Sequence, residues 1–255
     1  TSIKLSWKEV PDATGYAVYV KDGSWKLLKK TTAKSYTVSG LDKAAKYTFA
    51  VRAYRVQGSK TIWAPRYKSI KTATKPATPS KLIASQTSDS ISLTWSSVKG
   101  VTGYRIYKYS NGWKHVAYTT ATNYKLTSLH SGTKYIYCVR PYIKTDDGYV
   151  WGNYIKITTA TKPEAPTIRL ASTAKGRATI AWSNVSGESG YQVYYSASKS
   201  SGFKKISNYK ADTVKAYKTG LKSGKTYYFK VRAYKKVGDS YIYSPFSKTL
   251  SVKIK

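Results

Sequence analysis

Few residues of this chain belong to the types that catalyse reactions. Its 255 residues include two histidines and one cysteine. His115 and His130 lie at unrelated points, without acidic partners that would make either a general acid or base. Cys138 has no adjacent base that would lower the pKa of its thiol. We therefore predict two solvated histidines, an incidental, semi-exposed Cys138 thiol on the outward face of a strand, and no catalytic residue.

Motifs for nucleophilic, phosphate-binding and metal chemistry are also absent. The sequence contains no Gly-x-Ser-x-Gly, no glycine-rich phosphate loop and no His-Glu-x-x-His. A single cysteine excludes an intrachain disulfide and a cysteine-rich metal site. Asp146-Asp147-Gly148 supplies two adjacent carboxylates, whereas calcium prefers about six to eight oxygen ligands, so we interpret it as a turn. We expect no metal, no cofactor and no enzymatic activity.

Aromatic residues supply chemistry suited to binding instead, since 26 residues are tyrosine. Period-two alternation places three similar sets on the outer faces of neighbouring strands. The sets are Tyr19, Arg52 and Tyr54; Tyr107, Arg140 and Tyr142; and Tyr194, Arg232 and Tyr234. Each set predicts either a cross-strand ladder with the arginine stacked between rings, or a flat platform for sugar rings. Because scaffold features recur more regularly than ligand sites, we favour the ladder.

A second aromatic group precedes the last predicted strand of each segment. Its members are Trp63, Trp151 and Tyr243, in Ile-Trp-Ala-Pro, Val-Trp-Gly-Asn and Ile-Tyr-Ser-Pro. An exposed tryptophan in a loop there would anchor a protein partner. Packing against the end of the folded segment is the favoured alternative, because all three segments carry an aromatic ring. We expect edge packing for a third group: Trp25, Trp113 and Phe203.

The charge is strongly positive and evenly spread. Lys and Arg outnumber Asp and Glu by 45 to 11, a formal charge of +34. The ratio is 16 to 4 in residues 1–75, 11 to 3 in 76–162 and 18 to 4 in 163–255. Of the 45 cationic residues 37 are lysines, which favour diffuse attraction over the planar, bidentate recognition that arginine gives. The alternative is that the charge only keeps the chain dispersed in water.

Internal repeats must position these residues. Trp7, Trp95 and Trp182 are separated by 88 and 87 residues, and a Gly-Tyr pair follows each at a similar offset. The segment Thr-Ala-Thr-Lys-Pro also occurs twice, ending at Pro76 and Pro163. This period is too long for a solenoid repeat and fits a series of complete small domains. We place them at residues 1–75, 76–162 and 163–255.

Each segment reads as all-β. Ile91–Trp95 alternates apolar and polar residues with period two, as do 104–107 and 47–53. Asp-Gly and Asn-Gly pairs, which suit tight hairpins, punctuate these runs. No helical period is sustained. Several short strands within about 90 residues predict a β-sandwich.

Three motifs recur in each segment: Trp on the second strand, Gly-Tyr-x-Val/Ile-Tyr on the third, and Leu-x5-Tyr-x3-Val-Arg-x-Tyr near the sixth. These residues resemble the fibronectin type III family, whose fold is an immunoglobulin-like β-sandwich. The resemblance covers nearly the whole chain three times. It implies a core tryptophan and a tyrosine corner, a phenol that closes the Greek key. The lysine- and tyrosine-rich character is similar to type III domains of secreted Gram-positive surface proteins and multidomain glycosidases.

One segment departs from this pattern. Residues 79–85 and 166–171 read as first strands of the second and third domains, but Ser2–Trp7 aligns with 90–95, so the first domain lacks its first strand. We therefore expect the chain to be an internal or C-terminal piece of a longer protein. Proline-containing joints favour semi-rigid connections and hence an elongated array of three sandwiches.

These observations predict a non-enzymatic extracellular module, secreted or attached to a cell surface. It would present neighbouring domains and bind an anionic polysaccharide or cell-wall polymer through its lysines. The alternatives are a carbohydrate-binding accessory module of a polysaccharide-degrading enzyme and an adhesin for a host glycan or protein. Nucleic acid would bind only non-specifically, because no recognition motif is present. No apolar run approaches the ~20 residues needed to span a membrane, so we expect no membrane insertion, and lysine-rich edges favour a monomer.

Overall fold

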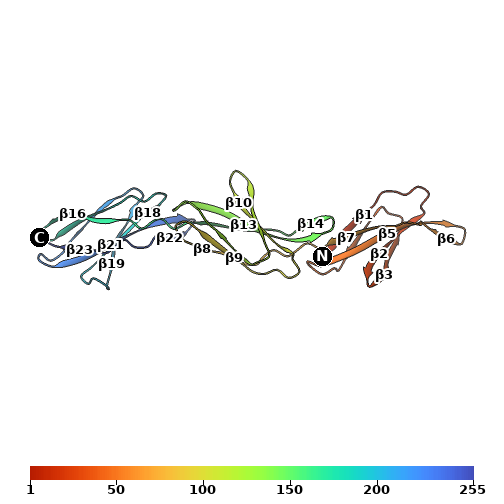
Figure 1. Cartoon of the computed structure of the whole chain (residues 1–255), viewed down its shortest axis with the longest axis horizontal. Helices are drawn as coiled ribbons and strands as arrows, with labels where there is room; N and C mark the ends of the chain where they lie inside the picture. Colours follow the sequence, from red (N-terminus) through yellow and green to blue (C-terminus); the bar gives the residue numbers. More distant parts are fainter. The chain divides into compact units, whose positions relative to one another are not determined.

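The computed structural model describes all 255 residues as 23 strands connected by turns and loops, without a helix (Figure 1). The strands form six sheets, two in each repeat, as the predicted all-β sandwiches require. No helix that could cross a membrane is found.

The first repeat contains a two-stranded sheet, β1-β4, and a five-stranded sheet in which β3, β2, β5 and β6 follow one another and β7 also pairs with β5. Its strands are β1 (Ser2–Ser6), β2 (Gly15–Asp22), β3 (Ser24–Thr31), β4 (Ser35–Ser39), β5 (Lys46–Gln57), β6 (Lys60–Trp63) and β7 (Lys68–Ala73). The smaller sheets of the other repeats have three strands each, so the first repeat lacks its first strand, as predicted.

The middle repeat has the sheet β12-β9-β8 and the sheet β11-β10-β13-β14, in which β15 also pairs with β13. Its strands are β8 (Leu82–Gln86), β9 (Ile91–Trp95), β10 (Gly103–Tyr109), β11 (Trp113–Thr119), β12 (Asn123–Leu126), β13 (Lys134–Thr145), β14 (Gly148–Trp151) and β15 (Ile155–Ala160).

The third repeat has the sheet β16-β17-β20 and the sheet β19-β18-β21-β22, in which β23 also pairs with β21. Its strands are β16 (Ile168–Ala174), β17 (Arg177–Trp182), β18 (Gly190–Ser196), β19 (Lys204–Lys210), β20 (Lys215–Thr219), β21 (Thr226–Val237), β22 (Ser240–Tyr243) and β23 (Leu250–Lys253).

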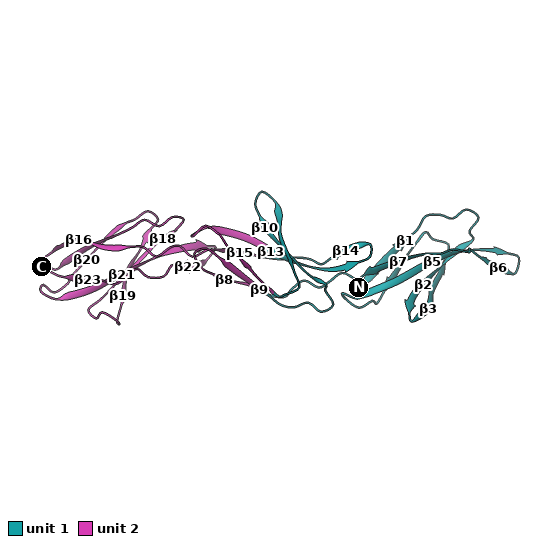
Figure 2. Cartoon of the chain, in the orientation of Figure 1, with its two compact units in different colours: residues 1–82, 95–122, 138–156 teal, residues 83–94, 123–137, 157–255 magenta.

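The chain separates into two compact units whose boundary runs through the middle repeat (Figure 2). One unit comprises residues 1–82, 95–122 and 138–156, and the other comprises 83–94, 123–137 and 157–255. The first repeat therefore shares a unit with β10, β11 and β14, and the third repeat shares one with β8 and β12.

Period-two alternation builds the cores of the first and third repeats. In the first, Leu5, Val18 and Phe49 from three strands form one buried cluster. In the third, the corresponding cluster contains Trp182, Val193 and Phe229. Burying large apolar side chains on the inner face of each sheet is the main stabilising contribution to such a sandwich. The inner faces predicted from the sequence are therefore confirmed.

A tyrosine corner is present in every repeat, as the resemblance implied. In each, the tyrosine hydroxyl accepts a hydrogen bond from a backbone N–H five residues earlier. The pairs are Asp42 N with Tyr47 at 3.0 Å, His130 N with Tyr135 at 3.0 Å, and Lys222 N with Tyr227 at 3.2 Å. The phenol thus fixes the loop before the long central strand of each repeat.

The repeated Thr-Ala-Thr-Lys-Pro segment continues this loop anchor. Thr161 is fully buried; its hydroxyl accepts from the Thr133 N–H at 3.1 Å and donates to the carbonyl of His130. Thr74 makes the same pair of bonds with Ala45 N and the Asp42 carbonyl in the first repeat. The recurring joint sequence therefore ties the end of one repeat to its tyrosine corner.

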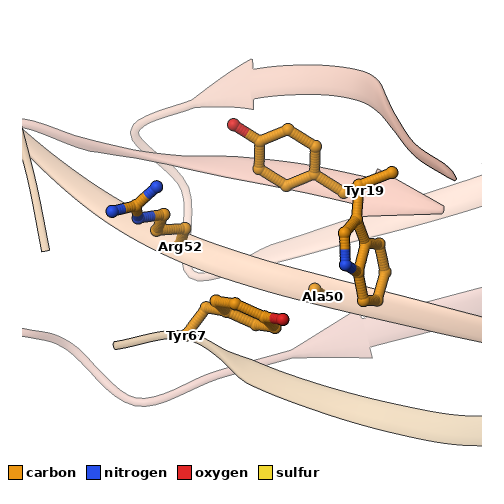
Figure 3. Close-up of a pocket in the computed structure, with 5 residues that line it drawn as sticks. Tyr19, Ala50, Arg52 and Tyr67 are labelled. Carbon is orange, nitrogen blue, oxygen red and sulfur yellow. The ribbon is translucent and has the colours of Figure 1, made fainter. Parts of the chain in front are cut away.

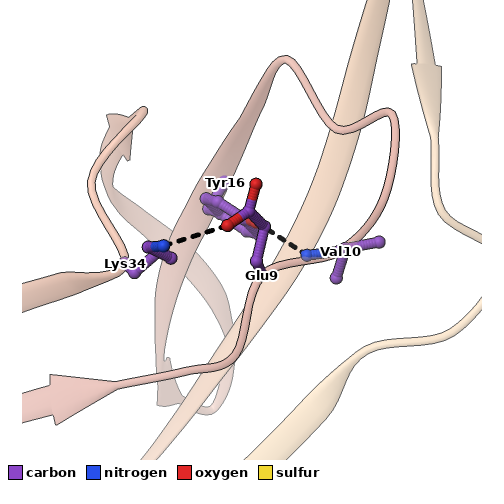
Figure 4. Close-up of polar contacts among 4 residues, drawn as sticks. All are labelled: Glu9, Val10, Tyr16 and Lys34. Atoms are coloured by element: carbon purple, nitrogen blue, oxygen red, sulfur yellow. Dashed lines mark hydrogen bonds and ion pairs between the residues drawn. The ribbon is translucent and has the colours of Figure 1, made fainter.

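The Gly-Tyr pairs have two separate functions. A Cβ atom on Gly15 would lie 2.6 Å from the Tyr54 hydroxyl, and one on Gly103 would lie 2.7 Å from the Thr119 carbonyl oxygen. Only glycine lets the tyrosine of the neighbouring strand and the adjacent backbone approach this closely. The following tyrosine holds the preceding loop, since the Tyr16 hydroxyl accepts the Val10 N–H at 2.9 Å (Figure 4).

An ion pair supports the same loop in the first repeat. The Lys34 ammonium lies 2.9 Å from the Glu9 carboxylate, beside the Tyr16–Val10 bond (Figure 4). Hydrogen bonding and charge attraction from Glu9 raise the pKa of Lys34. Both side chains are largely exposed, so this pair orients the loop more than it stabilises the fold.

The first and middle repeats meet in an apolar cluster within one compact unit. Ala44 and Ala73 of the first repeat pack with Ile143, which is fully buried, and with Val150. Lys71 and Asp146 form an ion pair at 2.7 Å beside this cluster, which places the predicted Asp-Asp-Gly turn at a contact between repeats. The cluster and the ion pair together hold the β13–β14 hairpin against the first repeat.

The middle and third repeats approach through glycine. A Cβ on Gly132 would lie 2.8 Å from the Ser186 carbonyl oxygen, and one on Gly187 would lie 2.8 Å from the Gly132 carbonyl oxygen. The two backbones therefore touch without intervening side chains. At the equivalent place between the first two repeats, Ala44 faces Gly100.

The prediction for Cys138 is wrong. Its side chain is 2% exposed and its thiol pKa is raised to about 12, because burial penalises the thiolate. Tyr137 and Val139 are also fully buried, so both faces of β13 are covered here. Cys138 lies two residues before Arg140, as Ala50 lies before Arg52, and in the first repeat Tyr19, Trp25 and Tyr67 surround this position on the outer face. The period-two alternation correctly placed Cys138 on the outer face of β13, but it does not show that other side chains cover that face.

Candidate functional site

The outer face of each five-stranded sheet carries the predicted aromatic and arginine sets. In the first repeat Tyr19 on β2 lies opposite Ala50 on β5, and the Tyr54 phenol covers Gly15. The third repeat has the same register, with Tyr194 opposite Lys230. The predicted sets therefore share one face in these repeats, where they are half-buried rather than fully exposed.

The second aromatic group lies on strands rather than in loops, which corrects the sequence interpretation. Trp63 pairs with Tyr54 in the β5–β6 register, Trp151 pairs with Tyr142, and Tyr243 pairs with Tyr234. The long central strand of each repeat forms a hairpin with the next strand, and this hairpin gives the aromatic residue a cross-strand partner. The ring centroids of Tyr54 and Trp63 are 5.3 Å apart. None of the three residues is an exposed loop anchor.

Arginine ties this hairpin to the sheet in the first two repeats. The Nε of Arg52 donates to the Ala64 carbonyl at 2.8 Å, and that of Arg140 donates to the Gly152 carbonyl at 2.9 Å. Each guanidinium also lies over the neighbouring tryptophan, 5.6 Å from Trp63 and 5.3 Å from Trp151. These contacts support the structural-ladder interpretation.

Arg232 satisfies its donors differently in the third repeat. Its Nε and one terminal nitrogen donate to the Gln192 side-chain oxygen at 2.9 and 2.8 Å, and the same terminal nitrogen donates to the Tyr194 hydroxyl at 3.2 Å. The guanidinium lies 3.8 Å from the centre of the Tyr243 ring. With its fork bonded to Gln192, Arg232 has fewer donors left for a ligand than Arg52 has.

The sequence analysis missed a fourth aromatic position. Three or four residues after the hairpin aromatic, each repeat places another ring against the third predicted group. Trp25 contacts Tyr67 with centroids 5.8 Å apart, Trp113 contacts Tyr154 at 5.6 Å, and Phe203 and Phe246 both contact Lys230. The recurrence of an aromatic residue three or four positions after Trp63, Trp151 and Tyr243 was the available signal.

These residues enclose a hollow in the first repeat. Its volume is about 170 Å³, and Tyr19, Trp25, Ala50, Arg52 and Tyr67 line it. Figure 3 shows Ala50 at the base, with Tyr19 and Tyr67 on opposite sides and the Arg52 side chain at one end. The hollow thus combines three aromatic walls with one permanent positive charge.

The middle repeat presents stacked rings instead. Tyr149 stacks on Trp151 with centroids 5.4 Å apart and lies parallel to Tyr118 at 6.3 Å. Tyr118 and Tyr149 are nearly half exposed. Burial and the neighbouring phenols of these two residues raise the pKa of Tyr142 at the centre of the group. A row of exposed, parallel rings suits the apolar face of a sugar.

The two histidines are the remaining candidates, and the ring of His115 contacts those of Tyr118 and Tyr107, with centroids 4.8 and 6.4 Å apart. His115 and His130 are exposed, and the backbone N–H of His130 serves the tyrosine corner. No group of three or more His, Cys, Asp or Glu side chains is positioned to hold a metal ion. Lysines gather instead on edge strands, with exposed pairs at Lys29–Lys30 on β3 and Lys204–Lys205 on β19.

The family assignment follows from the repeated sandwich, its tyrosine corner and a direct sequence match. The profile of the fibronectin type III domain matches residues 1–68, 77–157 and 161–249. The chain belongs to the fibronectin type III family. Its three repeats are therefore type III domains, and the buried tryptophans Trp95 and Trp182 are those the family resemblance implied.

Several proteins that contain type III domains are similar to this chain. Exoglucanase B of Cellulomonas fimi is 29% identical over all of this chain and 24% of its own length. Fibronectin type III domain-containing protein 7 of Mus musculus is 30% identical over 78% of this chain and 27% of its own length. Chitinase A1 of Niallia circulans is 28% identical over 65% of this chain and 25% of its own length. The chain thus spans about a quarter of the curated relatives it matches.

Proposed function

We propose that this chain is a non-catalytic, extracellular type III array that presents neighbouring domains and binds anionic polymers. The observation that most supports this proposal is the excess of 34 cationic over anionic side chains, which is spread through all three repeats. At most 11 of the 45 cationic side chains can pair one-to-one with an Asp or Glu side chain, so most of them carry a charge that no carboxylate of the chain neutralises. Such binding is weak at each contact, multivalent and sensitive to salt.

The arrangement of the lysines supports this proposal. Exposed lysine pairs lie on β3 and β19, which are edge strands of the five-stranded sheets of the first and third repeats. The pairs are Lys29 with Lys30 and Lys204 with Lys205. Lysine on an edge strand also opposes strand-to-strand association, which supports a monomer. A flexible polyanion can contact successive repeats without a preformed pocket, because a lysine side chain adapts to many geometries.

The relatives support an extracellular location and a spacer role. An exoglucanase and a chitinase each contain a region similar to this chain, and the match covers about a quarter of each enzyme. We infer that the present chain likewise accompanies other domains of a longer protein. The apolar contact of Ile143 with Ala44 and Ala73 would limit bending between the first two repeats, which suits a spacer.

A second candidate function is carbohydrate binding by ring stacking. The parallel rings of Tyr118, Tyr149 and Trp151 and the names of the two glycosidase relatives favour it. This mode needs no charge on the ligand and tolerates salt, because stacking depends on desolvated contact rather than on long-range attraction. A protein adhesin is less favoured, since Trp63 and Trp151 are packed on their own sheets.

A binding array separates these functions. Immobilised wall teichoic acid, sulfated and sialylated glycans, DNA and neutral polysaccharides are probed with the full chain at low salt and at about 0.15 M salt, where the Debye length is about 8 Å. We expect binding to anionic polymers in general and a steep loss with salt. Salt-resistant binding to one neutral glycan would contradict the proposal and support the stacking function. Absence of binding to every polyanion at low salt would leave only the spacer role.

A further inference from the structure

The residue at the floor of the hollow in the first repeat is replaced by a larger one in the third repeat. In the first repeat the floor is Ala50, opposite Tyr19 in the strand register. In the third repeat the same register position, opposite Tyr194, is Lys230. The Lys230 ammonium lies 4.1 Å from the centre of the Phe203 ring and 4.2 Å from that of Phe246. The lysine therefore fills the space that Ala50 leaves open.

The walls of the open hollow offer two kinds of interaction. Trp25, Tyr67 and Tyr19 present ring surfaces that can cover the apolar face of a sugar. Arg52 uses its Nε for the Ala64 carbonyl at 2.8 Å, so its terminal nitrogens remain as donors for a ligand. Guanidinium groups bind carboxylates through paired, charge-assisted hydrogen bonds.

Charge and size limit the occupant. A cationic ligand would meet Arg52 inside the hollow and a surrounding region, residues 1–75, where cations outnumber anions by 16 to 4. A carboxylate would meet attraction from both. The volume of about 170 Å³ is below the range of about 300–1,000 Å³ that holds drug-sized ligands, so the hollow takes one ring rather than several.

We propose that the hollow lined by Tyr19, Trp25, Ala50, Arg52 and Tyr67 binds a single carboxylated sugar unit of an acidic polysaccharide. The ring lies against the aromatic walls, and the carboxylate accepts hydrogen bonds from Arg52. This inference rests on the proposed binding of anionic polymers and adds to it one specific site. The lysine-rich surface supplies long-range attraction, and the hollow selects a ring that carries the charge.

The substitution Ala50→Lys fills the hollow and at the same time adds a positive charge, so the hollow and general charge attraction predict opposite effects on binding. It introduces the side chain that the third repeat already accommodates at this register position, so the fold should tolerate it. It also adds one positive charge, which would strengthen diffuse binding. The proposal expects about tenfold or greater weakening for a short oligogalacturonate, the change expected when a central contact of a site is lost. Ile62→Lys, at an exposed position on β6, adds the same charge outside the hollow and should not weaken binding.

Three probes, titrated against the full chain at about 0.15 M salt by calorimetry, distinguish the ring from the charge. Oligogalacturonate has both, its methyl ester has the ring without the charge, and polyglutamate has carboxylates without the ring. The proposal expects oligogalacturonate to bind most tightly, and only its binding to be weakened by Ala50→Lys. Equal binding of the ester, or unchanged or tighter binding of oligogalacturonate to the variant, would overturn it.

The same series separates this site from the general polyanion function. If polyglutamate fails to bind the wild-type chain even at low salt, the proposed function fails. If polyglutamate binds and Ala50→Lys leaves oligogalacturonate unaffected, only the hollow fails. Trp25→Leu provides a second variant, since Trp25 is 36% exposed and its loss removes a wall without filling the floor. Unchanged oligogalacturonate binding in this variant would also contradict the proposal.

Discussion

Replacing Ile143 with alanine should uncouple the first repeat from the middle one. Ile143 is 0% exposed, although its hairpin position is occupied by Arg55 in the first repeat and Lys235 in the third. It is buried because it packs with Ala44 and Ala73 across the joint and with Val150 beside it. The side chain therefore stabilises the contact between two repeats rather than the core of either.

The size of the effect follows from this complete burial. Truncating a buried isoleucine to alanine costs about 2–5 kcal/mol, and the small partners Ala44 and Ala73 cannot expand to fill the space. For a cooperative unit of 150–250 residues, such as the first two repeats together, each 1 kcal/mol lowers Tm by roughly 2–4 °C, so even the lower limit gives a fall of about 4 °C or more. Because the contact is shared, the unfolding of these two repeats should also become less cooperative.

Differential scanning calorimetry of the full chain measures both consequences. We expect the transition that contains the first two repeats to fall and to broaden or divide, while unfolding of the third repeat stays in place. Ile62→Ala is the matched control, since Ile62 occupies the equivalent hairpin of the first repeat and is 51% exposed. A Tm change in Ile143→Ala no larger than in this control would refute the argument that Ile143 couples the repeats.

Two further predictions concern buried ionisable groups. Because burial raises the pKa of the Cys138 thiol to about 12, an aromatic disulfide reagent at pH 8 should leave it unmodified in the native chain and modify it only after unfolding; rapid native labelling would contradict this. The pKa of Tyr191 is also raised to about 12, mainly by burial, so the native state retains protons that the unfolded state loses. The contribution of these two groups to stability should therefore be constant below about pH 9, the ordinary thiol value, and be lost as the pH rises toward 12. Urea unfolding at stepped pH would measure this fall. Stability that rises between pH 9 and 12 would be inconsistent with a buried, neutral Cys138 and Tyr191.

Features that arise within a single repeat could be predicted from the sequence. Residues 47–53 alternate with period two, and Phe49 of this run is fully buried in the core. The resemblance to type III domains, carried in part by Leu41 and Tyr47, implied a tyrosine corner, which the bond from the Asp42 N–H to Tyr47 confirms. These features depend on local periodicity and on one loop closure, so a pattern in the chain is enough to reveal them.

Features that depend on contacts from outside the pattern could not be predicted. Cys138 alternates correctly onto the outer face, but alternation does not show that large side chains cover that face. Tyr67 follows β6 in an irregular segment, where no period indicates the direction of a side chain. The burial of Ile143 depends on another repeat altogether, so its own repeat carries no signal for it.

Comparison among the three repeats gives the best guide to which part of the outer face binds a ligand. Arg52, Arg140 and Arg232 each bond to their own repeat and stack on their own rings, so their recurrence is explained by structure. The floor position varies on this constant frame, being Ala50, Cys138 and Lys230 in turn. Alanine leaves a hollow and lysine fills it, although either is compatible with the same strand pairing. Because stability does not require one residue at this position, its identity is free to set access to the aromatic walls of the proposed site, and we expect a ligand to reach them in the first repeat.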